Sequence, residues 1–154
     1  MKELETGKYL FTHRDEENFK KVLPLTRVKE VVIDDGIETI SSEYFSGYCN
    51  MDKVTLPDSV TVIAYDGFAH CFNLKGVILP KNLKAIKSFA FRECHSLGSD
   101  SNGVLIIPRS VNIIEDFAFD ECFSLKTIVL CNPETIVEKD AFHRCIDIKI
   151  YRGK

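Results

Sequence analysis

A phenylalanine recurs along this chain at nearly constant steps, at Phe45, Phe68, Phe91, Phe119 and Phe142. The steps are 23, 23, 28 and 23 residues. A fixed period of this length is typical of repeat proteins, in which each copy is one structural unit and neighbouring copies stack. The single long step contains an insertion between two copies, Gly98-Ser99-Asp100-Ser101-Asn102. The chain is therefore constrained to fold as a stack of about five similar turns.

Further apolar residues keep fixed distances from each phenylalanine. A branched aliphatic residue lies five positions before it, at Ile40, Ile63, Ile86, Ile114 and Val137. A cysteine lies three positions after it, at Cys71, Cys94, Cys122 and Cys145, and we assign Cys49 to the same column with a shift of one residue. When copies stack, each column becomes a continuous internal ladder of like side chains.

The residues upstream of each phenylalanine alternate with a period of two, which predicts a short strand with one buried face. The buried pairs are Val31 and Ile33, Val54 and Leu56, Val77 and Leu79, Leu105 and Ile107, and Ile128 and Leu130. A proline follows in three copies, at Pro57, Pro80 and Pro108. Proline has no N–H for the ladder, so these strands should end there.

The fold class predicted from these columns is an α/β solenoid with a parallel strand ladder along one side. The spacings of three and five between the proline and the cysteine favour turns or short helical segments on the opposite side.

The repeat has the form LxxVxLPxSVxxIxxxAFxxCxxL, which resembles the BspA-type leucine-rich repeat. The clearest copy supplies Val54 to Val60, Ile63, Gly67-Phe68, Cys71 and Leu74. The Ala-Phe element is better matched at Ala90-Phe91, Ala118-Phe119 and Ala141-Phe142. The resemblance covers about four fifths of the chain and implies a leucine-rich repeat fold. It also implies a role in protein binding or adhesion, because proteins of this kind are often found on microbial surfaces.

Two regions follow from the repeat boundaries. Residues 1–27 are predicted to be an N-terminal cap, with a short helix from His13 to Val22 after an N-cap at Thr12 and a degenerate first strand at 9–11. Residues 28–154 are predicted to be the repeat domain, with residues 98–102 forming an exposed loop.

Composition excludes several classes of function. The formal net charge is −3 and no basic stripe is present, so nucleic acid is not an expected partner. No apolar run is long enough to span a bilayer, so no membrane insertion is expected. The N-terminus lacks the apolar segment of a signal peptide. The chain as it stands is therefore expected in the cytoplasm, whereas the family resemblance suggests a surface or secreted protein.

No arrangement of residues indicates catalysis, a metal or a cofactor. His70, His95 and His143 lie beside column cysteines, but no Cys-x-x-Cys pair accompanies them. No Gly-x-Ser-x-Gly nucleophile motif occurs either. The six cysteines permit a disulfide framework, but we favour buried thiols that fill their column. We therefore expect a protein that is not an enzyme.

The outward strand positions are the predicted protein-binding residues: Val32, Thr55, Ile78, Ile106 and Val129, with Lys53 beside them. Four of the five are β-branched and apolar, and a contiguous exposed apolar row marks a partner surface. The alternative is that β-branched residues simply suit strands. We predict contact with a protein partner, a second subunit or the rest of a longer chain, and self-association through the strand edge at 148–154. The alternative function is a structural spacer in a larger surface or secreted protein.

Overall fold

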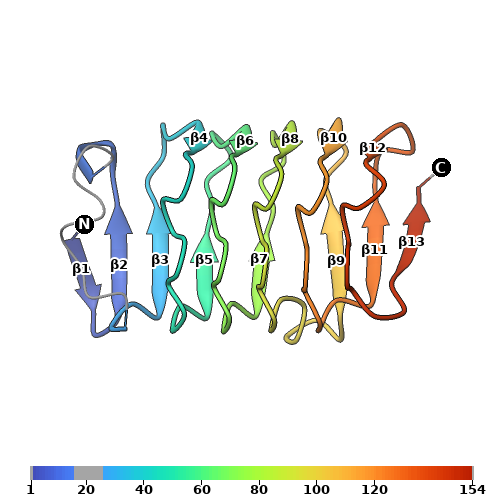
Figure 1. Cartoon of the computed structure of the whole chain (residues 1–154). Helices are drawn as coiled ribbons and strands as arrows, with labels where there is room; N and C mark the ends of the chain where they lie inside the picture. Colours follow the sequence, from blue (N-terminus) through green and yellow to red (C-terminus); the bar gives the residue numbers. More distant parts are fainter. Residues whose placement is uncertain (1, 16–25, 154) are drawn as a thin grey trace.

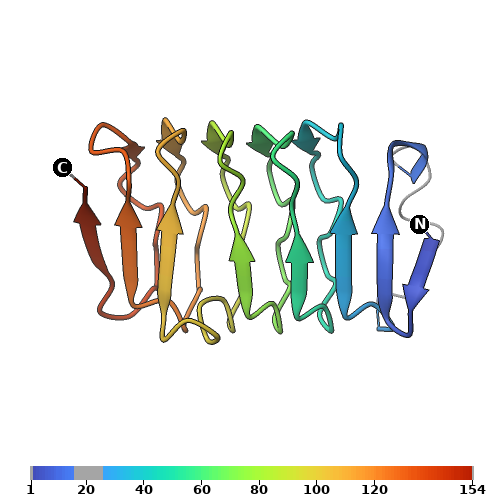
Figure 2. The same cartoon turned by 180° about the vertical axis from the view of Figure 1, so that it is seen from behind.

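The structure, a computed structural model, describes residues 2–15 and 26–153. Successive turns of the chain stack in one direction, so the N- and C-terminal ends lie at opposite ends of an elongated solenoid (Figure 1). One side carries the longer strands, and the other side carries very short strands and turns (Figure 2).

The longer strands form the predicted parallel ladder. They are β2 (Lys8–Phe11), β3 (Glu30–Ile33), β5 (Lys53–Thr55), β7 (Gly76–Ile78), β9 (Val104–Ile107), β11 (Thr127–Leu130) and β13 (Lys149–Arg152). Strands β2, β3, β5 and β7 pair in parallel, as do β9, β11 and β13. Strands β5, β7 and β9 all end before the proline of their copy, as expected from the missing N–H.

The opposite side corrects the α/β assignment. It is a second parallel sheet of two-residue strands: β4 (Thr39–Ile40), β6 (Val62–Ile63), β8 (Ala85–Ile86), β10 (Ile113–Ile114) and β12 (Ile136–Val137). The described residues contain one helical element, the 3-10 turn η1 (His13–Asp15). The chain is therefore a β-solenoid, and of the two alternatives predicted for this side the turns are present and the short helical segments are not.

Left-handed residues explain why the turns do not become helices. In the second copy Asp66 and His70, two residues before and after Phe68, have φ of 54° and 59°. The same two offsets are left-handed in the third and fourth copies, at Phe89, Glu93, Phe117 and Glu121. An L-residue in this conformation cannot continue a right-handed helix, so each turn is interrupted twice.

The number of turns is about six rather than five. Strand β2 pairs in parallel with β3, with Tyr9 opposite Val31 and Phe11 opposite Ile33, and so adds a turn before the first phenylalanine of the series. Strand β2 covers residues 9–11, where a degenerate first strand was predicted. Strand β1 (Lys2–Glu5) runs antiparallel to β2. Of the predicted helix from His13 to Val22, η1 covers the first three residues, and residues 16–25 lie outside the described part of the chain.

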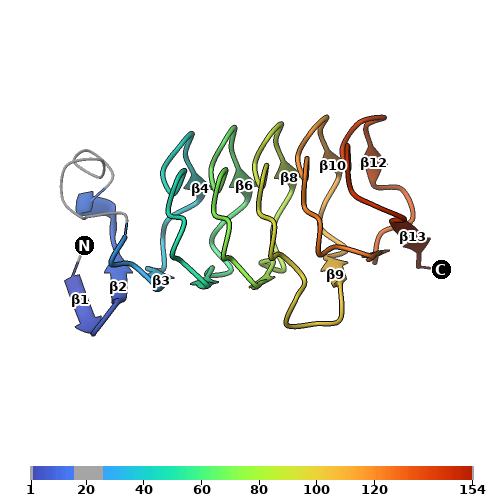
Figure 3. The ribbon, with the colours of Figure 1, turned by 60° about the horizontal axis from the view of Figure 1, so that its bottom comes forward.

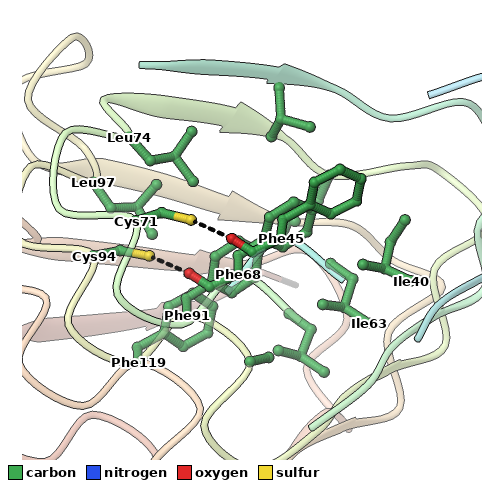
Figure 4. Packing of buried hydrophobic residues seen from close by; sticks show 14 of the residues in the cluster. Ile40, Phe45, Ile63, Phe68, Cys71, Leu74, Phe91, Cys94, Leu97 and Phe119 are labelled. Carbon is green, nitrogen blue, oxygen red and sulfur yellow. Dashed lines mark hydrogen bonds between the residues drawn. The ribbon is translucent and has the colours of Figure 1, made fainter. Parts of the chain in front are cut away.

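The phenylalanine column forms the centre of the core (Figure 4). Successive rings from Phe45 to Phe142 are stacked, with centroids 5.1–5.3 Å apart and interplanar angles of 4–13°. Phe11 contacts Phe45 edge-on at 5.1 Å, at the N-terminal end of this stack. The aliphatic column beside it is fully buried at Ile40, Ile63, Ile86 and Ile114. Stacking therefore buries side chains that a single copy would leave exposed.

The cysteine column is buried as predicted at Cys71, Cys94 and Cys122, and all six cysteines are free thiols. The assignment of Cys49 to this column is wrong. Tyr48, which lies at the cysteine offset from Phe45, is 2% exposed and packs edge-on against that ring, whereas Cys49 is half-buried. The offset from the phenylalanine decides which residue points inward, not the residue type.

Candidate binding surface on the strand face

The insertion divides the strand ladder into two sheets. The first sheet ends at β7 and the second begins at β9, and these two strands share no ladder hydrogen bonds. On the opposite side β8 and β10 pair directly, Ala85 opposite Ile113 and Ile86 opposite Ile114. The insertion therefore opens the strand face and leaves the other sheet continuous.

Hydrogen bonds at the base of the insertion show how the strands are separated. The Gly98 N–H donates to the Lys75 carbonyl at 2.7 Å, as the Lys75 N–H does to Asp52 at 3.1 Å. Gly98 thus keeps the register of a regular copy. The Gly103 N–H then closes the loop onto the Gly98 carbonyl at 2.8 Å, and β9 begins only after this closure. Gly98 and Gly103 have φ of 92° and 82°, a conformation that glycine adopts without strain. The loop protrudes beyond the neighbouring turns (Figure 3).

A hollow of about 880 Å³ lies over this division and is lined by β5, β7, β9 and the insertion. Four of the six predicted binding residues line it: Lys53, Thr55, Ile78 and Ile106. Ile78 is 89% exposed and Ile106 is 59% exposed, on either side of the division.

The other two predicted residues lie outside the hollow and are half-buried. Val32 is the register partner of Thr55, which in turn lies opposite Ile78. Val129 is the register partner of Ile106 on the far side. The structure thus places all five outward residues in one row across the strands, interrupted between Ile78 and Ile106.

The lysines of the hollow are each matched by a carboxylate. Lys53 lies 3.6 Å from Glu30, and Lys75 lies 3.8 Å from Asp52. Lys81 lies 2.6 Å from Asp58, and this hydrogen bond raises the pKa of Lys81 and lowers the pKa of Asp58.

Asp100, at the tip of the insertion, differs from these groups. Its exposed carboxylate has no hydrogen bond or ion pair within the described residues. It lies over Gly76, where a β-carbon would collide with it. The other long parallel strands carry a side chain at the position equivalent to Gly76, namely Lys8, Glu30, Lys53, Val104, Thr127 and Lys149. Because Gly76 has no side chain, the carboxylate of Asp100 can occupy the space above it.

The three histidines lie in separate environments. The Nδ1 atom of His70 is 3.2 Å from Glu93, and that of His143 is 2.8 Å from Asp120. His95 is stacked between Phe72 and Phe123, with centroids at 5.0 and 4.8 Å. Within the ranges 2–15 and 26–153, no group of three or more His, Cys, Asp or Glu residues is placed to hold a metal ion.

The half-exposed row of Phe72, His95 and Phe123 is a feature that the sequence analysis missed. All three residues lie four positions after the phenylalanine of their copy, and this shared offset is the signal that could have revealed it. In the part of the chain that the structure describes, no helix is both long and apolar enough to cross a bilayer.

Solved structures share this architecture. A leucine-rich repeat protein of T. pallidum is 26% identical with a TM-score of 0.72, and the match covers 94% of this chain and 63% of that one. A leucine-rich repeat protein of Bacteroides ovatus is 26% identical with a TM-score of 0.62, covering 81% and 37%. The pneumococcal vaccine antigen PcpA is 26% identical with a TM-score of 0.63, covering 82% and 31%.

The chain thus spans less than two thirds of the length of each of these proteins. No curated protein matches it significantly. The family described as the BspA type leucine-rich repeat region matches residues 16–149 in six copies. With the ladder of phenylalanines and the stacked turns, this match shows that the chain belongs to the BspA-type leucine-rich repeat family.

Proposed function

We propose that this chain is a non-catalytic protein-binding module that contacts its partner through the strand face. The observation that carries the proposal is the exposure of Ile78 and Ile106 on either side of the hollow. Exposed apolar side chains that are surrounded by polar groups are a mark of interaction surfaces. Here the polar rim is supplied by ion-paired lysines such as Lys75 and Lys81.

Adhesion or scaffolding is the setting we propose for this binding. Membership of the family supports it, because the family resemblance implies protein binding or adhesion, and a solenoid offers an extended surface rather than a closed catalytic pocket. A location at the cell surface or outside the cell is part of the same proposal.

The experiment compares two equally exposed isoleucines, one on the strand face and one on the sheet of short strands on the opposite side. Ile106 on β9 and Ile136 on β12 are both 59% exposed. The wild type, Ile106→Asp and Ile136→Asp are immobilised, and proteins captured from lysate and culture medium of the source organism are identified by mass spectrometry. We expect Ile106→Asp to lose a specific partner that wild type and Ile136→Asp both retain.

Two results would overturn the proposal. Retention of every partner by Ile106→Asp would exclude the strand face as the binding surface. Capture of no specific protein by the wild type would instead favour the alternative of a structural spacer, in which the repeats set a distance within a larger surface protein.

Self-association through β13 is a second proposal about partners. All four residues of β13 are exposed, and β11 is its one strand neighbour in the described residues. An exposed strand edge can pair with another chain. Ile150→Pro would remove one backbone N–H from this strand, so we expect it to reduce any dimer seen by light scattering at increasing concentration. An unchanged dimer fraction would exclude this edge.

A further inference from the structure

We infer that the division between β7 and β9 binds an extended polypeptide segment in which a basic residue and an apolar residue lie two positions apart, on the same face of the segment. This inference rests on the proposed protein-binding function and specifies the chemistry of the partner. Three features of the division support it: open strand edges, exposed β-branched side chains and a single unmatched carboxylate.

The open edges provide the main-chain contacts. Strand β7 pairs on one side with β5, with Lys53 opposite Gly76 and Thr55 opposite Ile78. Its other edge faces the hollow, as does the edge of β9 that is not paired with β11. A strand edge without a neighbour is a template for an extended peptide, whose backbone hydrogen bonds supply affinity.

The side chains beside these edges suit a strand partner. Ile78 and Ile106 are both exposed and β-branched, and residues of this type form favourable cross-strand pairs with other apolar side chains. The hollow of about 880 Å³ is within the size range of sites that enclose small ligands, so it has room for a few residues of extended chain.

The charged groups at the site favour a partner segment that carries a positive charge. Lys53, Lys75 and Lys81 each have a carboxylate within ion-pair distance. The carboxylate of Asp100 has none among the described residues, and it lies directly over Gly76 of β7. A lysine or arginine of the partner would therefore gain an ion pair with Asp100, whereas an acidic residue there would be repelled.

The test uses three fluorescein-labelled hexapeptides and fluorescence anisotropy. The first, the lysine–valine peptide, has lysine and valine two positions apart and serine at the positions between them. The second has glutamate in place of lysine, and the third is the lysine–valine peptide with alternate backbone nitrogens methylated. We expect the first to bind at least about tenfold more tightly than either of the others, because the second has the wrong charge and the third cannot donate the main-chain hydrogen bonds.

Two variants separate a specific site from general attraction of a basic peptide to an acidic protein. Asp100→Asn is expected to weaken binding of the lysine–valine peptide about fivefold or more. Asp35→Asn removes the same charge from an exposed position outside the hollow and is expected to leave binding unchanged.

Absence of binding by the lysine–valine peptide would overturn the inference. Equal binding of the methylated peptide, or equal weakening by Asp100→Asn and Asp35→Asn, would overturn it as well. Each of these results would leave the proposed function standing if Ile106→Asp still loses its captured partner. The two experiments thus distinguish failure of the peptide site from failure of the proposed protein-binding function.

Discussion

The thiol of Cys94 donates a hydrogen bond to the carbonyl oxygen of Phe68 in the preceding turn, 3.2 Å away (Figure 4). Within the described residues no backbone N–H donates to this carbonyl. Cys71 and Cys122 make the same contact with Phe45 and Phe91, at 3.1 Å each. The cysteine column thus joins successive turns by hydrogen bonds from side chains that also fill the core.

Replacement of Cys94 by alanine is therefore expected to destabilise the fold by about 1–3 kcal/mol, because it leaves the buried Phe68 carbonyl without a donor and a small void in the core. Urea unfolding followed by circular dichroism would measure the change. Cys131→Ala is the matched control, since Cys131 is half-buried at the end of β11 and should cost less than about 1 kcal/mol. Equal losses in the two variants would show that the Cys94 hydrogen bond adds nothing.

Thiol reactivity should divide the six cysteines into groups. Cys71, Cys94 and Cys122 are fully buried, and burial raises the pKa of each thiol. Burial also raises the pKa of the partly exposed Cys145 to about 11. Since the thiolate is the reactive form, a maleimide should label Cys49 and Cys131 first, Cys145 more slowly, and the three buried thiols only after unfolding. Mass spectrometry of peptides over time checks this order, and early labelling of Cys94 would contradict it.

Periodicity predicted the side chains of the core but not the path of the backbone between them. The phenylalanine, aliphatic and cysteine columns follow from constant offsets, and most of the residues that they name are buried. The second sheet was missed because its strands are two residues long, which is too short for an alternation of period two to be visible. The left-handed conformations of Phe89 and Phe117 were missed because phenylalanine, unlike glycine or asparagine, gives no sign of them.

At the candidate site, too, the sequence predicted which side chains are exposed but not the path of the backbone. Sequence alternation identified Ile78 and Ile106 as outward residues, and the structure confirms their exposure. The insertion was expected to be an exposed surface loop, whereas it also separates β7 from β9. This separation depends on the residue at which the chain returns to the repeat register after the loop. The hydrogen bond from the Gly103 N–H to the Gly98 carbonyl sets that residue, and the sequence pattern does not reveal this bond.

The ion pair between Lys87 and Glu115 should make part of the stability depend on pH. The two groups lie 2.6 Å apart, and the Ser88 N–H also donates to the Glu115 carboxylate at 3.0 Å. Partial burial raises the pKa of Glu115, but the hydrogen bonds from Lys87 and Ser88 outweigh it and hold the pKa below its ordinary value. A carboxyl whose pKa is lower in the folded state contributes stability above its unfolded pKa and loses it as the pH falls through the folded pKa.

Glu115→Gln should therefore lower the free energy of unfolding near neutral pH by about 0.5–1 kcal/mol and have a smaller effect at about pH 3. Urea unfolding at the two pH values measures the difference. Glu134→Gln is the control, because this exposed residue makes no side-chain contact to a cation among the described residues. An effect of Glu115→Gln that is equally large at both pH values would indicate a packing defect rather than a titrating contact.

Deletion of residues 98–102 should close the division in the strand face. It joins Leu97 to Gly103 and restores the 23-residue step between Phe91 and Phe119. Strand β9 would then follow β7 in the register that β5 and β7 already share, and the continuous pairing of β8 with β10 on the other side already permits this spacing. We expect amide hydrogen exchange in β7 and β9 to slow and the free energy of unfolding to rise by about 1 kcal/mol, from new ladder hydrogen bonds and a shorter loop.

The same deletion tests whether the division matters for binding. Ile78 and Ile106 would become direct cross-strand neighbours, so the hollow between them and the carboxylate of Asp100 would both be lost. The deletion variant should therefore fold at least as stably as the wild type and yet lose the lysine–valine peptide. Ser99→Ala, which keeps the loop length, should retain both the fast exchange of β7 and the peptide. If exchange in β7 and β9 were as fast in the deletion variant as in wild type, the insertion would not be the cause of the separation.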